Sequence, residues 1–472
     1  MDSNKLNNHL IGVKNELDSV GCGFCLAKWT QVTMHLQIGH THSCHHPGTH
    51  PIPQREIKRN PSALHNTRFK KLKRKEMLEG KRPKECDYCW NVEDNSDEFS
   101  DRVFKSSEPW SINHMEEIKN SSWKQDFNPR YVEVSFSNAC NFKCSYCSPQ
   151  FSTKWMEEIE EHGAYPTTDG FNGLDYLIQE DKMPIPIKDH NPYVEAFWKW
   201  WPDLYKDLHT FRITGGEPLM SKDTWKVLDY IIEEKNPNTN LSLAINSNLG
   251  VPDALIDRFI EKVNRITLEN KVKDFVIFTS CDAHGERAEY IRNGLVYNKF
   301  MDNVDKILKN CPRVNITFMV TYNALSVPNY DKMLYDVYDL KVAHKGLDRY
   351  WPGAILVDTS YLRHPQHQAV KTLMNDKTYD WSQNVWKQAE TMYYLQAPYF
   401  AKQEAGYGDL EIIKMKRIYD WMRSEDDKDI RNMRMYNFYN YFRSHDERRG
   451  TSFVKTFPEL EDFYNQCKEI KL

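Results

Sequence analysis

From Arg130 onward the sequence alternates between short apolar runs and longer amphipathic segments, and this alternation limits the folds open to the chain. The expected strands are residues 131–136, 209–214, 240–246, 274–281, 313–320 and 353–358. Amphipathic helices are expected near residues 222–235, 252–263, 299–310, 328–341 and 365–375. Strands that alternate with helices form βα units and a parallel sheet. The sequence therefore predicts an α/β fold of six βα units, fewer than the eight of a closed barrel.

Composition gives bounds on size, partners and compartment. The chain has 472 residues, enough for two or three domains. A net charge of -4 gives no general reason to expect a nucleic acid or an anionic membrane as partner. The chain has no run of eighteen apolar residues, and its first residues lack the pattern of a signal peptide. Eight of the eleven cysteines cluster in metal-ligand spacings, which fits a reducing compartment, so we expect a cytoplasmic protein without a membrane partner.

A run of three cysteines directly follows the first expected strand. Cys140, Cys144 and Cys147 have the spacing C-x3-C-x2-C. A structural zinc site or an ordinary ferredoxin cluster takes four protein ligands. The next cysteine is the distant Cys281, and the nearest downstream histidine, His162, lies in a charged segment without ligand-like spacing. The run therefore predicts a four-iron cluster with one iron left open for a substrate or cofactor.

The cysteine spacing, with Tyr146 before the last cysteine, resembles the radical S-adenosylmethionine (radical SAM) superfamily. The resemblance implies a partial (β/α)6 TIM-like barrel and a [4Fe-4S] cluster on Cys140, Cys144 and Cys147, the catalytic residues. It also implies reductive cleavage of SAM to methionine and a 5'-deoxyadenosyl radical, which abstracts hydrogen from a substrate. A flavodoxin or ferredoxin would be the reductant. The cofactors carry this chemistry, and the protein orients them and excludes water.

Polar residues follow the later strands, where ligands gather in parallel βα folds. After the second strand comes T-G-G-E-P, and two glycines let a backbone approach a ligand while a carboxylate receives an ammonium group. In the family this motif binds the amino group of SAM. The resemblance assigns SAM contacts to Tyr146 and to residues after the second, third and fourth strands: Gly215, Gly216, Glu217, Asn246, Asn248, Ser280 and Arg292.

One of these assignments, and the role of two neighbouring residues, leave alternatives open. Asn246 and Asn248 could also be a plain cap between strand and loop. Arg292 suits a SAM carboxylate because a guanidinium forms two parallel bonds to it. The nearby Asp282 and His284 could face the substrate or could only shape the turn.

The first hundred residues form a separate module rich in Cys, His and Lys. From Cys25 the spacing is C-x13-G-x4-C, through Gly39 to Cys44, and the pair Cys86 and Cys89 closes the module. This succession is similar to the twitch and SPASM auxiliary-cluster modules of radical SAM enzymes. The resemblance implies a second iron-sulfur cluster on the four cysteines, which would favour a net oxidation. In those families the module follows the catalytic domain, whereas here it precedes it, as in bacteriophage-type and bacterial proteins that this chain also resembles.

Zinc is the competing interpretation of this module. Cys22, Cys25, Cys86 and Cys89 match a zinc-ribbon set. Seven histidines lie between the two pairs, and we expect each at the surface: His35, His40, His42, His45, His46, His50 and His65. Iron-sulfur is favoured, because Gly39 and Cys44 have no place in the plain ribbon. Apolar periodicity is low here, so we expect the metal to hold the module together.

The sequence predicts four parts. They are the cysteine-rich module (1–105), a linker (106–129), the barrel (130–375, with an insertion at about 165–205) and a helical C-terminal extension (376–472). A peptidyl or small-molecule substrate is the leading expectation. The basic run Arg68–Lys84 and the C-terminal aromatic residues support a nucleic-acid substrate as the alternative. For the run itself, an amphipathic helix with a solvated basic face is favoured. The other alternative is a non-catalytic iron-sulfur or zinc protein.

Overall fold

The computed structural model describes residues 3–345, 353–396 and 405–472 of the chain. The chain forms two compact units. The first comprises Met1–Ser137, Pro184–Gly215 and Lys235–Ala244, and the second comprises Asn138–Met183, Gly216–Glu234 and Ile245–Leu472. Strand β7 (Ser242–Asn246) begins in the first unit and ends in the second. None of the described helices is long and apolar enough to cross a membrane.

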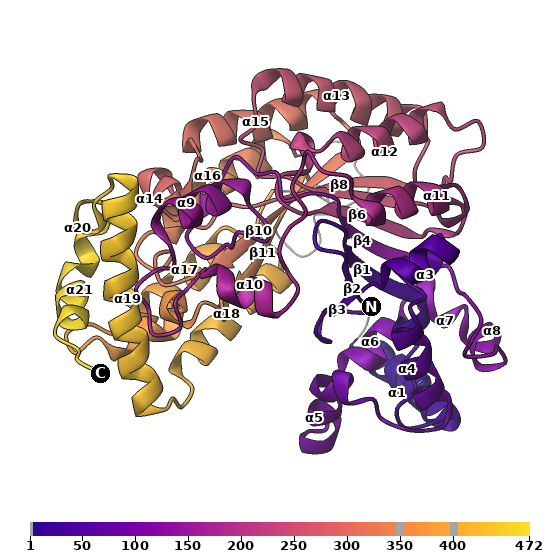
Figure 1. The fold of residues 1–472 in the computed structure, drawn as a ribbon. Coiled ribbons are helices and arrows are strands. Elements are labelled where there is room, and N and C mark those ends of the chain that lie inside the picture. Colours follow the sequence, from indigo (N-terminus) through magenta and orange to yellow (C-terminus); the bar gives the residue numbers. More distant parts are fainter. Residues whose placement is uncertain (1–2, 346–352, 397–404) are drawn as a thin grey trace. The chain divides into compact units, whose positions relative to one another are not determined.

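The first unit combines a sheet with short helices, which Figure 1 colours from indigo to magenta. Its strand order is β3-β2-β1-β4-β6, in which β1, β4 and β6 are parallel and β2 and β3 are antiparallel to their neighbours. These strands are β1 (Gln31–His35), β2 (His40–His42), β3 (His50–Pro51), β4 (Tyr131–Ser135) and β6 (Thr210–Thr214). Its helices are α1 (Ser3–Val20), α2 (Ala27–Thr30), α3 (Gln54–Arg59), η1 (Pro61–Leu64), α4 (Arg68–Leu78), η2 (Lys84–Cys86), α5 (Asp87–Asn95), α6 (Asp101–Ser107), α7 (Pro109–Ile112), α8 (Met115–Lys119) and α11 (Pro192–Asp207).

The N-terminal module has an apolar core of its own, contrary to the expectation that a metal must hold it together. Leu10, Val13 and Leu17 recur along one face of α1 and are at most 4% exposed. They belong to a cluster with Trp29, Trp90, Val103, Met115 and Ile118. Part of this core comes from α6, α7 and α8, of which α7 and α8 lie within the linker expected at 106–129.

The basic run does not have the solvated basic face expected from the sequence. Lys70 and Arg74 of α4 are fully buried, whereas Leu72 is 41% exposed. Lys70 is hydrogen-bonded to His65, and Arg74 donates to Asn66 and to the backbone carbonyl of Lys28. Five more of the cations form ion pairs within the chain: Lys71, Lys73, Lys75, Lys81 and Arg82. Most of the cations of this run therefore have hydrogen-bond or ion-pair partners inside this unit.

Three of the module's histidines are also buried, not exposed as expected. His65 lies between Lys70 and Arg74, and His42 donates from Nδ1 to the carbonyl of Cys44. His40 is 2% exposed. Hydrogen bonds to neighbouring groups account for the burial of His42 and His65, because a buried polar group needs a partner.

The second unit contains the remaining strands and helices of the βα series. Its parallel strands are β8 (Asp274–Thr279), β10 (Val314–Tyr322) and β11 (Ile355–Tyr361), with β10 between the other two. A separate antiparallel pair joins β5 (Lys143–Cys144) to β9 (Arg292–Asn293). Its helices up to β11 are α9 (Thr153–His162), α10 (Leu174–Gln179), η3 (Pro218–Met220), α12 (Lys222–Glu233), α13 (Asp253–Leu268), α14 (Gly285–Ile291), α15 (Tyr297–Asn310) and α16 (Tyr330–Ala343).

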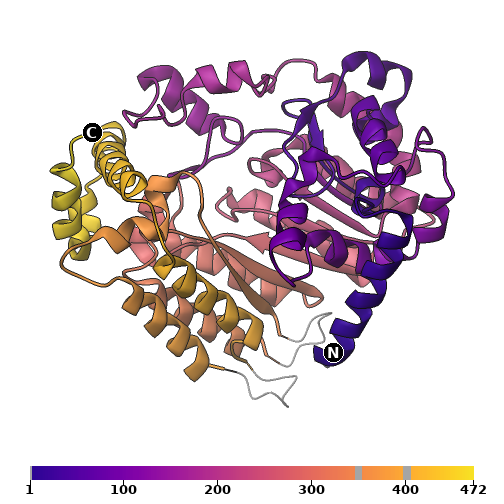
Figure 2. The same ribbon diagram turned by 90° about the horizontal axis from the view of Figure 1, so that it is seen from below.

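The C-terminal extension is helical, as expected. It contains α17 (Ser382–Tyr394), α18 (Asp409–Arg423), α19 (Lys428–Arg449), α20 (Phe453–Thr456), η6 (Pro458–Leu460) and α21 (Glu461–Lys468). Helix α19 packs on α21, and α17 packs on α18, as Figures 1 and 2 show.

The expected α/β fold with a parallel sheet is confirmed. In the described parts of the chain, the strands of neither unit close into a barrel, which agrees with a partial barrel. The amphipathic helix expected at 365–375 is wrong, because this segment forms the 3-10 turns η4 (Gln366–Gln368) and η5 (Val370–Asn375). The backbone is extended at Pro365, which precedes η4, and at Ala369, which separates η4 from η5. These two extended residues prevent a continuous α-helix.

Candidate functional site

The three cysteines of the C-x3-C-x2-C run lie in one folded loop of the second unit. Cys144 belongs to β5 and pairs with Arg292 of β9. The amide of Cys147 donates to the carbonyl of Cys144 (2.9 Å), which turns the chain back between the two thiols. Burial raises the pKa of Cys140, and the nearby thiols of Cys144 and Cys147 raise it further. The three thiols are therefore near enough to affect one another electrostatically, and a bound cation would favour their ionised form.

Side chains from distant parts of the second unit hold the backbone of this loop. Trp155 donates to the carbonyl of Cys144 (2.8 Å), and Asn172 donates to the carbonyl of Cys147 (2.8 Å). The carbonyl of Ser145 accepts from Gln368 (3.0 Å) and from the hydroxyl of Tyr441 (2.6 Å). Because each carbonyl has a fixed donor, the loop keeps the cysteines in place without depending on its own secondary structure.

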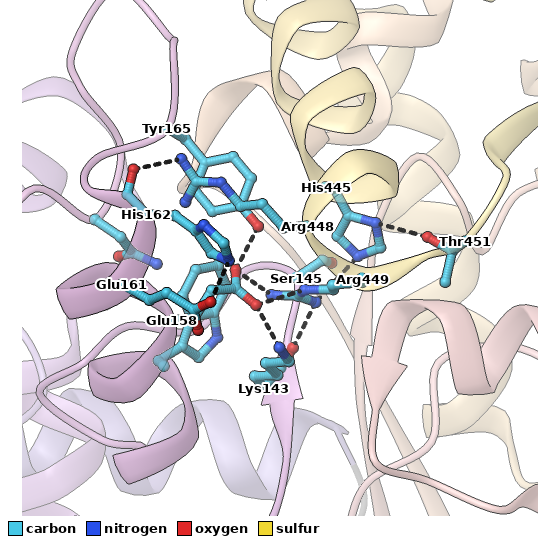
Figure 3. A network of polar contacts seen from close by, with 12 residues as sticks. Lys143, Ser145, Glu158, Glu161, His162, Tyr165, His445, Arg448, Arg449 and Thr451 are labelled. Carbon is cyan, nitrogen blue, oxygen red and sulfur yellow. Dashed lines mark hydrogen bonds and ion pairs between the residues drawn. The ribbon is translucent and has the colours of Figure 1, made fainter.

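A buried charge network anchors the start of the loop (Figure 3). Arg449 of α19 binds both carboxylate oxygens of Glu158, at 3.0 and 3.2 Å. The ammonium of Lys143 and the hydroxyl of Tyr165 reach the same carboxylate at 2.5 Å each. Burial acts to raise the pKa of Glu158, but Arg449 and Lys143 outweigh it and lower this pKa to about 2. Glu158 is therefore an anion in a site that is rich in donors.

Asp282 connects the fourth-strand loop to the cysteine run. It is fully buried and binds Arg292 through both oxygens, at 2.7 and 3.1 Å. It also accepts from the hydroxyl of Tyr146 (2.6 Å) and from the amide of Thr321 (2.8 Å). The guanidinium of Arg292 lies 3.7 Å from the sulfur of Cys144. Arg292 is therefore a fixed positive charge beside the cysteines, held by Asp282.

Glu217 lies in a buried nest of donors. Its carboxylate accepts from the amides of Leu219 (2.9 Å) and Asn248 (2.6 Å) and from the hydroxyl of Ser247 (2.8 Å). Burial raises the pKa of Glu217 to about 7, although these hydrogen bonds act to lower it. Its own amide donates to the carbonyl of Ala139 (2.6 Å), next to Cys140. The geometry therefore brings Glu217 to the backbone of the cysteine loop.

The other residues expected to bind SAM lie at strand ends. Asn248 donates to the side chain of Asn141 (2.9 Å), which follows Cys140. Asn246 is the last residue of β7, and Ser280 follows β8. Gly215 has a φ of +125°, a conformation that favours glycine. At Gly216 a Cβ would lie 2.3 Å from the carbonyl oxygen of Ala139, so only glycine permits this approach.

The four cysteines predicted to form an auxiliary site line one cavity of the first unit. Cys25, Cys44, Cys86 and Cys89 all border it, together with the buried cations Lys28 and Arg102. Burial, followed by the neighbouring Cys44, Cys86 and Cys89, raises the pKa of Cys25 to about 12. Cys22 is exposed and donates to the carbonyl of Gly80 (3.4 Å). Cys22 does not line this cavity, and Cys44 does.

Gly39 shapes the turn that leads to Cys44. Its φ is +69°, and a Cβ there would lie 2.3 Å from the ring of Tyr193. Any other residue would clash with this ring, so glycine is required at this position of the spacing.

No group of three or more His, Cys, Asp and Glu side chains within residues 3–345, 353–396 and 405–472 could hold a single metal ion. A four-iron cluster makes a different demand, because each thiolate binds its own iron. The second unit offers three neighbouring thiols, and four thiols line one cavity of the first unit. The donor chemistry of both sites therefore suits iron-sulfur clusters.

Sequence reasoning missed several residues that shape the site. The sequence did not decide whether Asp282 faces the substrate or only shapes the turn. In the structure it accepts hydrogen bonds from Arg292, Tyr146 and Thr321. The sequence did not indicate that Glu158 and Arg449 form a buried pair, because charged helix residues are common at protein surfaces. Tyr441 lies in the aromatic C-terminal stretch, whose pattern alone does not show which carbonyl it binds.

Comparison with known proteins finds relatives by sequence. No family model matches the sequence. The GTP 3',8-cyclase of Campylobacter lari is 25% identical over 119 residues, which is 25% of this chain and 28% of the cyclase. The GTP 3',8-cyclase of Nautilia profundicola is 27% identical over 116 residues, which is 25% of this chain and 27% of the cyclase.

These cyclases are radical SAM enzymes, and this chain is related to them. The expected superfamily is thereby supported in the part that the alignments cover. The chain spans only about a quarter of the length of the cyclases it matches.

Two solved structures align with the fold at low similarity. They are Streptococcus suis SuiB bound to its precursor peptide SuiA and SuiB bound to S-adenosylmethionine, at 14% and 15% sequence identity. Each alignment has a TM-score of 0.35 and covers 61% of the SuiB chain, with 71% and 73% of this chain. At this level the likeness supports no inference about ligands.

Proposed function

We propose that this chain is a radical SAM enzyme that removes hydrogen from a peptidyl or small-molecule substrate. The observation that supports this most is the buried loop that brings Cys140, Cys144 and Cys147 together next to Glu217. When bound, a reduced four-iron cluster supplies the electron that cleaves SAM to methionine and a 5'-deoxyadenosyl radical. The relationship to GTP 3',8-cyclases supports the same class of chemistry.

The chain's own residues would bind and orient these groups. The three thiolates would hold three irons, which leaves one iron free of protein ligands. Glu217 would accept the ammonium of SAM, because its carboxylate is already fixed by three donors. Arg292 would place its positive charge at Cys144, with Asp282 setting its orientation. Burial of Cys140, Glu217, Asp282 and Arg292 keeps water away from this side of the reacting centre.

We further propose that Cys25, Cys44, Cys86 and Cys89 hold an auxiliary iron-sulfur cluster. Their shared cavity supports this set over the zinc-ribbon set, which needs the exposed Cys22. A second cluster would accept an electron from the substrate, so the net reaction would be an oxidation. The reductant of the first cluster would be a flavodoxin or ferredoxin.

A nucleic-acid substrate has less support. Lys70 and Arg74 are buried, and five other cations of the basic run are paired within the chain. Phosphate contacts need accessible cations. Binding of RNA or DNA that weakens with salt and with loss of Arg68 would nevertheless restore this candidate.

The test of the proposed function is SAM cleavage by the anaerobically reconstituted protein. On reduction with dithionite we expect methionine and 5'-deoxyadenosine in equal amounts. Cys140→Ala, Cys144→Ala and Cys147→Ala should each abolish both products. Cleavage that persists in these variants would contradict the proposal.

The auxiliary site is tested by metal content. In the background of the triple variant of Cys140, Cys144 and Cys147, about four irons per chain should remain. Cys44→Ala should remove them, whereas Cys22→Ala should leave them. One zinc per chain, lost on Cys22→Ala, would instead establish a zinc ribbon.

A further inference from the structure

A second cavity lies beside the cysteine loop, within the second unit. Its volume is about 570 Å³, which is in the range of small-molecule sites. Tyr146 and Cys147 form one wall, and residues of α10, of the segment before it, of η4 and of α19 form the others. The cavity therefore lies beside the proposed reaction centre. It is not lined by the residues at the strand ends that were assigned to SAM binding.

Two of the side-chain amides that line the cavity form hydrogen bonds within the protein. Asn437 of α19 accepts from the amide of Thr168 (2.8 Å) and donates to its hydroxyl (2.8 Å). Asn172 donates to the carbonyl of Cys147. These two side chains shape the walls and link the segment before α10 to α19 and to the cysteine loop. Phe171, Leu177 and Met433 add apolar surface to the same cavity.

Arg434 differs from Asn172 and Asn437 in having a buried donor without a partner in the described parts of the chain. It is 5% exposed, and one nitrogen of its guanidinium is paired with Asp426. Its Nε is buried and has no hydrogen-bond partner among the described residues. Buried donors are nearly always paired, so a group from outside the chain is the natural partner for this one. Burial also lowers the pKa of Arg434.

The charges around Arg434 select the kind of partner. Lys371 is close enough that Arg434 lowers the pKa of Lys371 after the effect of burial. The amine of Lys371 is bound to Ser424 and to the carbonyl of Glu425. Asp426 offsets one of the two positive charges of Arg434 and Lys371. The remaining single positive charge favours a monoanion over a dianionic phosphate. His367, also in the wall, is kept neutral because burial lowers its pKa to about 3.

The residues that line the cavity differ in exposure. Arg434 is buried, whereas Asp169 and Tyr176 are exposed. A ligand would place its anion inside and its remaining atoms along Phe171, Leu177 and Met433. Asp169, which accepts from the hydroxyl of Thr167 (2.5 Å), could also accept an N–H of such a ligand near the rim.

We propose that this cavity binds a ligand in which a carboxylate is attached to an apolar group, with Arg434 holding the carboxylate. This is the chemistry of an N-acylated amino acid or of a peptide residue. That the ligand is the substrate rests on the radical SAM activity proposed above, whereas the binding itself does not.

The experiment compares two probes that differ in one charge. Equilibrium dialysis with the reconstituted protein measures binding of N-acetyl-L-phenylalanine and of its neutral amide. We expect the acid to bind about tenfold more tightly, since a charged partner strengthens a buried hydrogen bond. Arg434→Gln should abolish this preference, Arg434→Lys should keep part of it, and Arg443→Gln, an exposed arginine of the same helix, should keep it fully.

Three results would overturn the proposal. Equal binding of acid and amide by the unmodified protein would do so even if the variants fail to fold. Preserved preference in a folded Arg434→Gln variant would exclude Arg434 as the holder. Tighter binding of phenyl phosphate than of the acid would reassign the cavity to phosphates. SAM cleavage measured on the same preparation separates failure of this site from failure of the proposed activity.

Discussion

Arg449, the last residue of α19, donates a 2.9 Å hydrogen bond to the backbone carbonyl of Lys143, the residue directly before Cys144. The same guanidinium neutralises Glu158, which also binds the side chain of Lys143. A helix at the far end of the sequence thus fixes both the backbone and the side chain that begin the cysteine loop.

Arg449→Ala should destabilise the protein by about 3–5 kcal/mol, because it leaves the buried Glu158 without its main partner. Urea unfolding at pH 7 measures this loss. Arg443→Ala removes an exposed pair with Glu447 on the same helix and should change stability by less than about 1 kcal/mol. Similar midpoints for the two variants would show that the network does not hold the loop.

Asp282→Asn should leave the charge of Arg292 uncompensated at a position that is 6% exposed. We expect a loss of about 3–5 kcal/mol in the free energy of unfolding. We also expect an altered electron paramagnetic resonance spectrum of the reduced cluster, since Arg292 lies beside Cys144. Glu286→Gln, an exposed neighbour, is the matched control. An unchanged spectrum together with unchanged stability would contradict this role of Asp282.

Gly216→Ala should lower iron content after reconstitution, because the new methyl group would meet backbone atoms of Asn138 and Ala139. Overpacking of this kind costs about 1–3 kcal/mol. Gly48→Ala meets no atom within 4 Å and serves as the control. Iron per chain and melting temperature are the readouts, and full iron loading of the Gly216 variant would refute the prediction.

Glu217 gives a specific pH dependence. Burial raises its folded-state pKa to about 7 from the ordinary value of 4.5. Its contribution to stability is therefore complete below about pH 4.5 and is lost as the pH rises through about 7. A shift of this size corresponds to about 3 kcal/mol.

Between pH 4.5 and 8 the free energy of unfolding should change less in Glu217→Gln than in the unmodified protein. The expected difference is about 3 kcal/mol. Urea titrations of both across that range measure it, without SAM or metal. Glu233→Gln, an exposed residue of α12, should follow the unmodified protein. Parallel curves for all three would mean that Glu217 is ionised throughout.

The barrel strands were predictable to within a few residues, because each is a short apolar run that ends at polar or glycine residues. For example, residues 209–214 were expected and β6 is Thr210–Thr214. Strand β1 was missed, since Gln31, Thr33 and His35 alternate with apolar residues inside a histidine-rich segment. Pairing with β4 stabilises it, and pairing partners that are a hundred residues apart leave no local signal.

The site was predictable where spacing alone defines it. The two cysteine sets depend on spacing and on glycines such as Gly39 and Gly216, whose close contacts leave no alternative. The supporting residues could not be found in this way. Asp282, Glu158 and Arg449 act through contacts across the second unit, and a charged residue in a sequence does not show whether it will be buried.

The contact between Lys143 and Arg449 also has a consequence for biosynthesis. The two residues are 306 positions apart. A ribosome adds about 5–20 residues per second, so Arg449 is made about 15–60 s after the cysteine loop. During that interval the nascent loop lacks two of its backbone donors, Arg449 and Tyr441. The four cysteines of the N-terminal module belong to residues 1–137 and face no such delay. Iron delivery to the nascent chain could therefore complete the first unit's site well before the loop of Cys140, Cys144 and Cys147 has its final support.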